Sequence, residues 1–266
     1  MNLTMLGTGH ALVTECYNTC FVITDEDKRL LVDGGGGNTI LRQLKIKNIG
    51  LSEIHDIFVT HKHTDHLLGI IWIIRVICQQ MNQGKYEGAL NIYTHDEVLF
   101  LIRDMVKKLL LPREFALIDD RIALVEVVDG QCLDVIGHKT IFFDICSTKA
   151  KQFGFSMEIR ENEKLTCCGD EPYNEKERIY AENSKWLLHE AFCLYSERDV
   201  YKPYEKHHST VKDACELAEN LGVLNLLLYH TEDDNLLDRK KRYIQEGKDF
   251  YHGNLIVPED LETIIL

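Results

Sequence analysis

Proline is scarce in this sequence, low-complexity runs are absent, and no apolar run is long enough to span a membrane. Only four of the 266 residues are Pro, and 45% of the residues are hydrophobic against 27% charged. This composition excludes collagen, coiled coil and intrinsic disorder, and it predicts a chain that folds around a core. The most apolar stretch, Leu67 to Cys78, is interrupted by Arg75 and is shorter than the about 20 residues of a membrane helix.

Basic residues are in the minority. The chain has 30 Lys and Arg against 43 Asp and Glu, which gives a formal net charge of −13. Such a surface repels the phosphates of long nucleic acids, so extended tRNA or DNA binding is not expected. The N-terminus also lacks a basic segment followed by an apolar one, the pattern of an export signal. We therefore expect a cytoplasmic protein with no membrane partner.

Paired C-x-x-C units are missing as well. The nine Cys residues are odd in number and scattered, so neither a disulfide framework nor a structural zinc finger is indicated. Most of them are expected to be reduced and buried.

Apolar periodicity predicts a layered α/β chain without a linker, and we expect one domain over residues 1–266. The predicted strands are 3–6, 20–24, 29–32, 54–59, 90–93, 121–128, 132–136, 139–145, 154–160, 164–168, 186–189 and 223–229. The predicted helices are 38–45, 67–80, 96–111, 174–183 and 210–221.

A dense group of histidines follows the predicted strand that ends at Thr60. The segment His61-Lys62-His63-Thr64-Asp65-His66 supplies the nitrogen and oxygen donors that Zn²⁺ prefers. His61 and His63 are two residues apart on an extended segment, so their side chains point the same way. Asp65 and His66 stand at the start of a helix and can reach a second ion. The spacing therefore predicts a metal site, most simply one with two ions.

Several further segments, in the same order along the chain, resemble the metallo-β-lactamase superfamily, and in particular its ribonuclease Z and phosphodiesterase-like branch. These segments are Leu6-Gly7-Thr8-Gly9, Leu31-Val32-Asp33-Gly34-Gly35, Gly169-Asp170-Glu171-Pro172, His189-Glu190-Ala191-Phe192, His208-Ser209-Thr210 and Leu228-Tyr229-His230. The resemblance covers nearly the whole chain. It implies an αββα sandwich, in which two mixed β-sheets are flanked by helices, and a dinuclear site that binds zinc or manganese.

The resemblance also implies a role for each matching residue. His61 and His63 would hold the first metal, Asp170 would bridge the two, and the second metal would be held by Asp65, His66 and His230. Asp65 would act as general base, and His208, polarised by Glu190, would protonate the leaving group. Diiron flavoprotein relatives have Glu where His63 stands here, so hydrolysis is favoured over redox chemistry.

One histidine of the family pattern is missing. The family takes a third ligand for the first metal from the strand before Gly154, and residues 145–149 contain no His. Cys146 is the candidate replacement because a thiolate ligates Zn²⁺. The alternative is that Cys146 is a buried thiol and water completes the site.

The substrate is expected to be smaller than tRNA. Ribonuclease Z carries a long basic arm before the bridging aspartate, yet only 24 positions separate Cys146 from Asp170, and Thr231-Glu232-Asp233-Asp234 is acidic. These features favour a small phosphodiester such as a cyclic nucleotide or cyclic phosphate. The alternatives are a hydrolase of carboxylic esters, lactones or thioesters and a non-catalytic metal-binding protein. A homodimer is left open.

Overall fold

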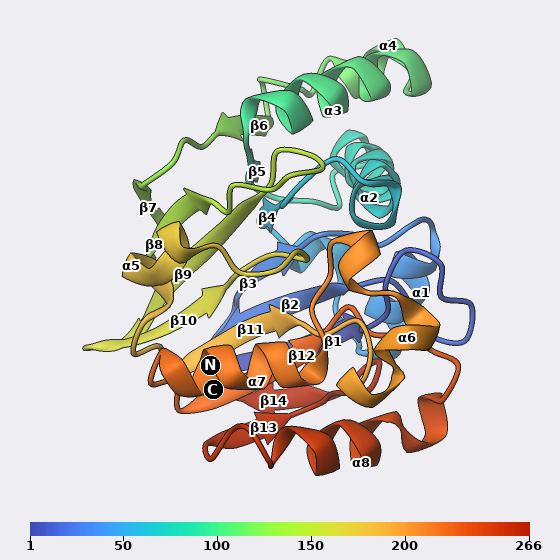
Figure 1. Ribbon diagram of the computed structural model, residues 1–266. Coiled ribbons are helices and arrows are strands. Elements are labelled where there is room, and N and C mark those ends of the chain that lie inside the picture. Colours follow the sequence, from blue (N-terminus) through green and yellow to red (C-terminus); the bar gives the residue numbers. More distant parts are fainter. The chain divides into compact units, whose positions relative to one another are not determined.

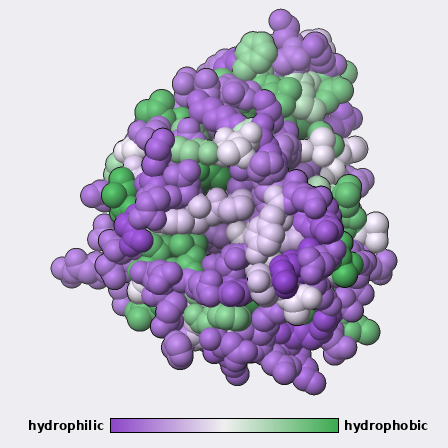
Figure 2. Space-filling model, in the orientation of Figure 1, coloured by the Kyte–Doolittle hydropathy of each residue, from purple (hydrophilic) through white to green (hydrophobic).

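The computed structural model describes all 266 residues, and the chain divides into two compact units (Figure 1). Unit 1 comprises residues 1–7, 18–128 and 261–266, and unit 2 comprises residues 8–17 and 129–260. Each unit contains one seven-stranded mixed sheet. Figure 2 shows a face on which hydrophilic residues predominate and apolar residues form small separate patches. None of the helices combines the length and apolar character that crossing a membrane requires.

The sheet of unit 1 has the strand order β14-β1-β2-β3-β4-β5-β6. The pairs from β3 to β6 are parallel, and the others are antiparallel. The strands are β1 (Asn2–Gly7), β2 (Cys20–Asp25), β3 (Lys28–Val32), β4 (Asp56–Phe58), β5 (Leu90–Thr94), β6 (Ile122–Glu126) and β14 (Thr263–Ile265).

Four α-helices and one short 3₁₀ helix complete unit 1. Helix α2 packs against α1, α3 and α4, and it buries Ile70, Ile74 and Ile77, which share one face at helical spacing. Helix α3 ends shortly before Pro112, which begins α4. The helices are α1 (Thr39–Ile46), η1 (Leu51–Glu53), α2 (Thr64–Asn82), α3 (Asp96–Leu109) and α4 (Pro112–Phe115).

The sheet of unit 2 has the strand order β13-β12-β11-β10-β9-β8-β7 and the same arrangement of directions. The pairs from β10 to β13 are parallel, and the others are antiparallel. The strands are β7 (Gln131–Val135), β8 (His138–Asp144), β9 (Phe153–Arg160), β10 (Glu163–Cys167), β11 (Trp186–Glu190), β12 (Asn225–Tyr229) and β13 (Asn254–Ile256).

The helices of unit 2 lie in the segments that connect its parallel strands β10, β11, β12 and β13. Thr210 caps α7 by accepting a hydrogen bond from the Asp213 amide, and Ala214 and Ala218 on the helix pack into the core with Leu226 and Leu228 of β12. The helices are η2 (Glu175–Glu177), α5 (Arg178–Ala181), η3 (Tyr195–Glu197), α6 (Arg198–Tyr201), η4 (Tyr204–Lys206), α7 (Val211–Asn220) and α8 (Leu236–Gly247).

Every strand predicted from the sequence is present, whereas one helix prediction is wrong. Residues 174–183 form two short pieces, η2 and α5, in place of one helix. The reason is local: the side chain of Asn174 accepts a hydrogen bond from the amide of Lys176, and the carboxylate of Glu177 accepts one from the amide of Asn174. These bonds close a tight turn at the start of the segment.

Candidate metal and acid–base site

The candidate residues stand where parallel strands end. In unit 1, Asp33 follows β3 and His61 follows β4, its parallel neighbour. In unit 2, Asp170 follows β10, Glu190 ends β11 and His230 follows β12, three adjacent parallel strands. The carboxyl ends of parallel strands meet at one edge of a sheet, which explains how residues distant in sequence gather there.

The histidine segment of unit 1 forms a compact cluster of donor atoms. Nε2 of His61 lies 2.8 Å from Nδ1 of His63, and the rings of His61 and His66 have centroids 4.2 Å apart. Nε2 of His66 lies 3.3 Å from Oδ2 of Asp65. His61, His66 and Asp65 are buried. Imidazole nitrogens and a carboxylate oxygen that converge in this way are the donor set of zinc and manganese sites.

A second layer of hydrogen bonds orients these donors. Oδ2 of Asp33 accepts hydrogen bonds from Nδ1 of His66 and from Oγ1 of Thr60, each at 2.7 Å, and Oδ1 accepts one from the Thr60 amide at 2.8 Å. Nδ1 of His61 lies 2.9 Å from the same Thr60 hydroxyl. Because Nδ1 of His66 is engaged with Asp33, Nε2 is the nitrogen turned toward Asp65, as in histidine ligands whose other nitrogen binds a carboxylate.

Glycine residues allow the turn that follows Asp33 to pack closely against the start of α2. The amide of Gly69 donates to the carbonyl of Gly35 at 2.8 Å, and the amide of Gly34 donates to the carbonyl of His66 at 2.9 Å. A Cβ atom at position 69 would lie 1.8 Å from the carbonyl oxygen of Gly34. Any side chain there would therefore separate the turn after β3 from the histidine segment.

The acidic loop of unit 2 places Asp170 beside His230. Oδ2 of Asp170 lies 3.3 Å from Nε2 of His230, and both side chains are buried. The Tyr229 hydroxyl donates a hydrogen bond to the carbonyl of Gly169. Gly169 has a φ of 76°, and His230 has a φ of 58°, which is uncommon for a residue with a side chain. Such conformations persist where the surroundings hold them, and they often mark functional sites.

Glu190 and His208 form a second buried pair in unit 2. Oε2 of Glu190 lies 3.7 Å from Nδ1 of His208, and the Ser209 amide donates to Oε1. The ring of Phe192 stacks on His208 with centroids 5.0 Å apart. Burial raises the pKa of Glu190 and lowers the pKa of His208 to about 2. Both shifts disfavour the charged form of the group concerned, and the contact places the two groups within reach of each other for proton transfer.

The structure brings most of the predicted site residues together within each unit. His61, His63, Asp65 and His66 lie together in unit 1, and Asp170, Glu190, His208 and His230 lie together in unit 2. Cys146 is not a member of these clusters of donor atoms, and its thiol donates to the carbonyl of Asp144 at 3.8 Å. Its role as a replacement ligand stays a prediction.

Sequence reasoning did not single out several residues that support the site. Thr60 links Asp33 to His61, Arg239 holds the residue after His230, and Lys149 lies beside His208. No motif marks these residues, because each contact depends on how distant segments pack.

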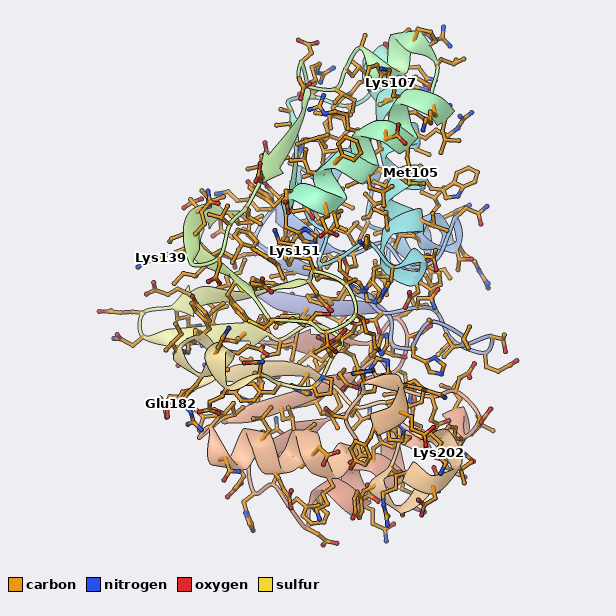
Figure 3. The ribbon with its side chains drawn as sticks, turned by 45° about the horizontal axis from the view of Figure 1, so that its top comes forward. Met105, Lys107, Lys139, Lys151, Glu182 and Lys202 are labelled. Atoms are coloured by element: carbon orange, nitrogen blue, oxygen red, sulfur yellow. The ribbon has the colours of Figure 1, made fainter.

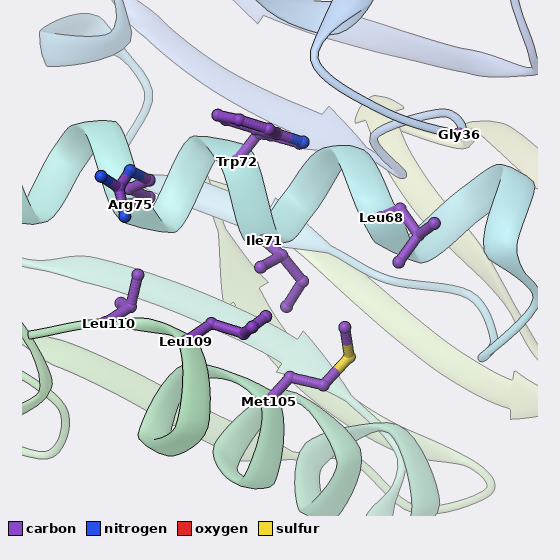
Figure 4. A pocket seen from close by; sticks show the side chains of 8 residues that line it. All are labelled: Gly36, Leu68, Ile71, Trp72, Arg75, Met105, Leu109 and Leu110. Carbon is purple, nitrogen blue, oxygen red and sulfur yellow. The ribbon is translucent and has the colours of Figure 1, made fainter.

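A separate cavity of about 390 Å³ lies in unit 1 between α2 and α3. Ile71 of α2 faces Met105 and Leu109 of α3 across it (Figure 4). Trp72, which is 42% exposed, and Arg75 also line it. The cavity is mainly apolar and contains none of the candidate ligands.

Known proteins resemble the chain over its whole length. Ribonuclease Z from Thermococcus sibiricus is 24% identical over 311 aligned positions, which cover 100% of this chain and 96% of that protein. The metallo-β-lactamase fold protein YhfI from Bacillus subtilis superposes with a TM-score of 0.80 at 17% identity, covering 99% of this chain and 98% of YhfI. Fold and site thus define a metal-binding hydrolase of the metallo-β-lactamase superfamily, in its ribonuclease Z-like branch. More specifically, the chain belongs to the family of the anti-Pycsar protein Apyc1, which matches residues 1–248.

Two further solved structures share the fold. A diphosphatase of the PhnP family has a TM-score of 0.77 at 15% identity, covering 100% of this chain and 97% of the diphosphatase. Zinc-bound PqqB from Methylobacterium extorquens has a TM-score of 0.75 at 12% identity, with 100% of both chains covered. The predicted fold class, the metallo-β-lactamase αββα fold with two mixed sheets flanked by helices, is confirmed.

Proposed function

We propose that this protein is a metal-dependent phosphodiesterase for small phosphodiesters, with cyclic nucleotides and cyclic phosphates as the first candidates, and that residues 1–266 act as one hydrolase domain. The residues named above would hold two divalent ions, with zinc as the first candidate metal and manganese as the second. His61 and His63 would serve the first ion, Asp65, His66 and His230 the second, and Asp170 both. The observation that carries the proposal is the cluster of buried His and Asp donors, oriented by Asp33 through Thr60 and His66.

The proposed reaction divides the proton transfers between two groups. Divalent ions, when bound, activate water and offset the negative charge of the phosphoryl oxygens. The carboxylate of Asp65 accepts a proton from the attacking water as the new P–O bond forms. His208 donates a proton to the leaving oxygen as the other P–O bond breaks, while Glu190 faces Nδ1 of His208. The carboxyl groups of Asp65 and Glu190 are both buried, which keeps the transferred protons out of bulk water.

The segment between Cys146 and Asp170 supports a small substrate. It contains a short loop and the β9–β10 hairpin, whose strands are joined by two residues. The alignment with the Thermococcus ribonuclease Z needs 311 positions for the 266 residues of this chain, so the relative has residues that this chain lacks. With the net charge of −13, these features favour a compact anion over a long nucleic acid.

Hydrolysis of bis(p-nitrophenyl) phosphate tests the proposal. The protein is stripped with a chelator, reconstituted with zinc or manganese, and compared with the His63→Ala and Asp65→Ala variants. His252→Ala is the matched control because His252 is exposed and its ring bonds to Glu219. We expect metal-dependent turnover that falls at least about a hundredfold in the first two variants and is unchanged in the control.

The same preparations separate the alternatives. Turnover of p-nitrophenyl acetate and thioesters without turnover of any phosphodiester would select a hydrolase of carboxylic substrates. Bound metal without turnover of either class would select a non-catalytic metal-binding protein. Either result overturns the phosphodiesterase proposal.

A further inference from the structure

An exposed lysine lies directly against the buried acid–base pair of unit 2. Nζ of Lys149 is 3.4 Å from Nε2 of His208, the ring nitrogen opposite the one that faces Glu190. Lys149 stands in the loop between β8 and β9, in the segment where the family's third metal-binding histidine is missing. An ammonium can only donate, so Nε2 accepts from Lys149 in this structure, and the same nitrogen would face a leaving group when substrate is bound.

Buried contacts hold the loop that carries Lys149. The carboxylate of Glu171, which is buried, accepts hydrogen bonds from the Ser147 hydroxyl at 2.7 Å and from the Thr148 amide at 3.2 Å. The Ser147 hydroxyl accepts in turn from the amides of Lys149 and Ala150, each at 3.2 Å. Glu171 follows Asp170 directly, so the loop is anchored to the same turn as the proposed bridging ligand.

Lys149 forms no salt bridge with an acidic side chain. Its ammonium contacts the imidazole of His208, and its charge partly offsets the burial that raises the pKa of Glu190. Other cations nearby are engaged with aromatic rings: Lys206 lies 4.8 Å from the ring centroid of Phe192, and Lys151 lies 5.6 Å from that of Phe153. In a chain of net charge −13, an anchored cation that has no salt bridge and lies beside a proton donor suits an anionic ligand.

We propose that Lys149 binds a non-bridging phosphoryl oxygen of the substrate and so selects anionic phosphodiesters over neutral esters. This inference rests on the proposed function, and it adds a substrate-binding residue from the loop that lacks the family's histidine. An oxyanion that meets Nζ also lies within reach of Nε2 of His208. The ammonium thereby brings the phosphoryl group to the residue that protonates the leaving oxygen, and no covalent bond to Lys149 forms.

Steady-state kinetics of charge variants test this role in the metal-loaded protein. The variants are Lys149→Gln, the conservative Lys149→Arg, and the matched control Lys151→Gln, which removes the same charge from the next lysine along the loop (Figure 3). For bis(p-nitrophenyl) phosphate we expect K149Q to raise KM about ten- to a hundredfold, K149R to restore most of the affinity, and K151Q to change little. With neutral p-nitrophenyl acetate the three variants should match the parent protein. Equal KM values for K149Q and K151Q on the diester would overturn the inference.

A binding measurement separates this inference from the proposed function. Calorimetry with inorganic phosphate reports binding whether or not any ester is turned over. Weaker phosphate binding in K149Q than in K151Q supports an anion-binding lysine even in a protein that hydrolyses no phosphodiester. Equal phosphate affinity in the two variants contradicts it even in an active phosphodiesterase.

Discussion

Nδ1 of His66 lies 2.7 Å from Oδ2 of Asp33, and both side chains are almost fully buried. Asp33 also accepts two hydrogen bonds from Thr60, so its carboxylate joins the end of β3 to the segment that follows β4. The ring of His66 is thus oriented by the protein itself. A ligand oriented in advance loses less freedom when it binds a metal, and its carboxylate partner makes it a stronger donor.

Replacing Asp33 should therefore weaken metal binding without removing a ligand. Asp33→Asn retains the size of the side chain but loses the charge that supports His66. We expect the affinity for one zinc ion to fall about ten- to a hundredfold, measured by competition with a chromophoric chelator. Asp56→Asn is the control, since Asp56 bonds to Asn91 and Tyr93 at the start of β4. Equal zinc affinity in the two variants would show that Asp33 only shapes the turn.

The Glu190–His208 pair should matter most when the leaving group is a poor one. A p-nitrophenolate ion departs without a proton, whereas a more basic phenolate needs one. For methyl aryl phosphodiesters of rising phenol pKa, we expect His208→Ala to lose rate progressively, by about a hundredfold or more for the most basic phenols. Glu190→Gln should shift the rates in the same direction.

The dependence of kcat/KM on phenol pKa provides the measurement. A steeper slope in H208A than in the parent protein is the signature of a lost general acid. A uniform loss across the series, with an unchanged slope, would instead assign His208 to binding or structure.

The candidate metal ligands of unit 1 could be proposed from the sequence because their pattern is local. His61, His63, Asp65 and His66 are close in sequence, so their spacing alone indicates a metal site, and the strands were predictable from apolar runs. The strands β13 and β14 have only three residues each, and their apolar runs are too short to indicate a strand, so they were not predicted. Helix α8 was also missed, because few of its side chains are apolar.

The supporting residues could not be predicted, because their contacts arise from tertiary packing. Lys149 and His208 are 59 positions apart, and Arg239 contacts Thr8 across 231 positions. Gly69 looks like an ordinary helical residue until the Gly34 carbonyl is seen against it. A sequence pattern indicates which face of a helix or strand is buried, but it does not indicate which other segments pack against that face.

Stability should fall with rising pH through one buried carboxyl group. Glu177 is 1% exposed, and burial raises its pKa from 4.5 to about 8. Between these two values the folded chain keeps a proton that the unfolded chain releases, so the free energy of unfolding decreases as pH rises from about 4.5 to 8. Glu177→Gln is neutral at every pH and retains an oxygen to accept the hydrogen bond from the Asn174 amide.

Urea denaturation at several pH values measures this effect. Relative to the parent protein, E177Q should gain roughly a few kcal/mol of stability between pH 5 and pH 8. Glu175→Gln is the control, because Glu175 is exposed and pairs with Arg178 in the same turn. Parallel stability curves for E177Q and the parent protein would rule out a raised pKa at Glu177.

Arg239 is the largest fully buried side chain, and it braces the residue that follows His230. Its guanidinium donates to the hydroxyl of Thr231 at 2.6 Å, and to the hydroxyl of Thr8 and the carbonyl of Pro258 at 3.1 Å each. Arg239→Met fills a similar volume but leaves these acceptors without their donor. We expect a loss of about 3 kcal/mol or more in the free energy of unfolding, because unsatisfied buried polar groups are costly.

The control for Arg239 lies one turn further along the same helix. Arg242→Met removes a partly exposed arginine that pairs with Glu197, and a pair at that exposure contributes at most about 1 kcal/mol. Because Thr231 follows His230, whose φ of 58° needs support, R239M should also weaken zinc binding in chelator competition, whereas R242M should not. Loss of stability with unchanged zinc affinity would mean that the buried guanidinium stabilises unit 2 but does not position His230.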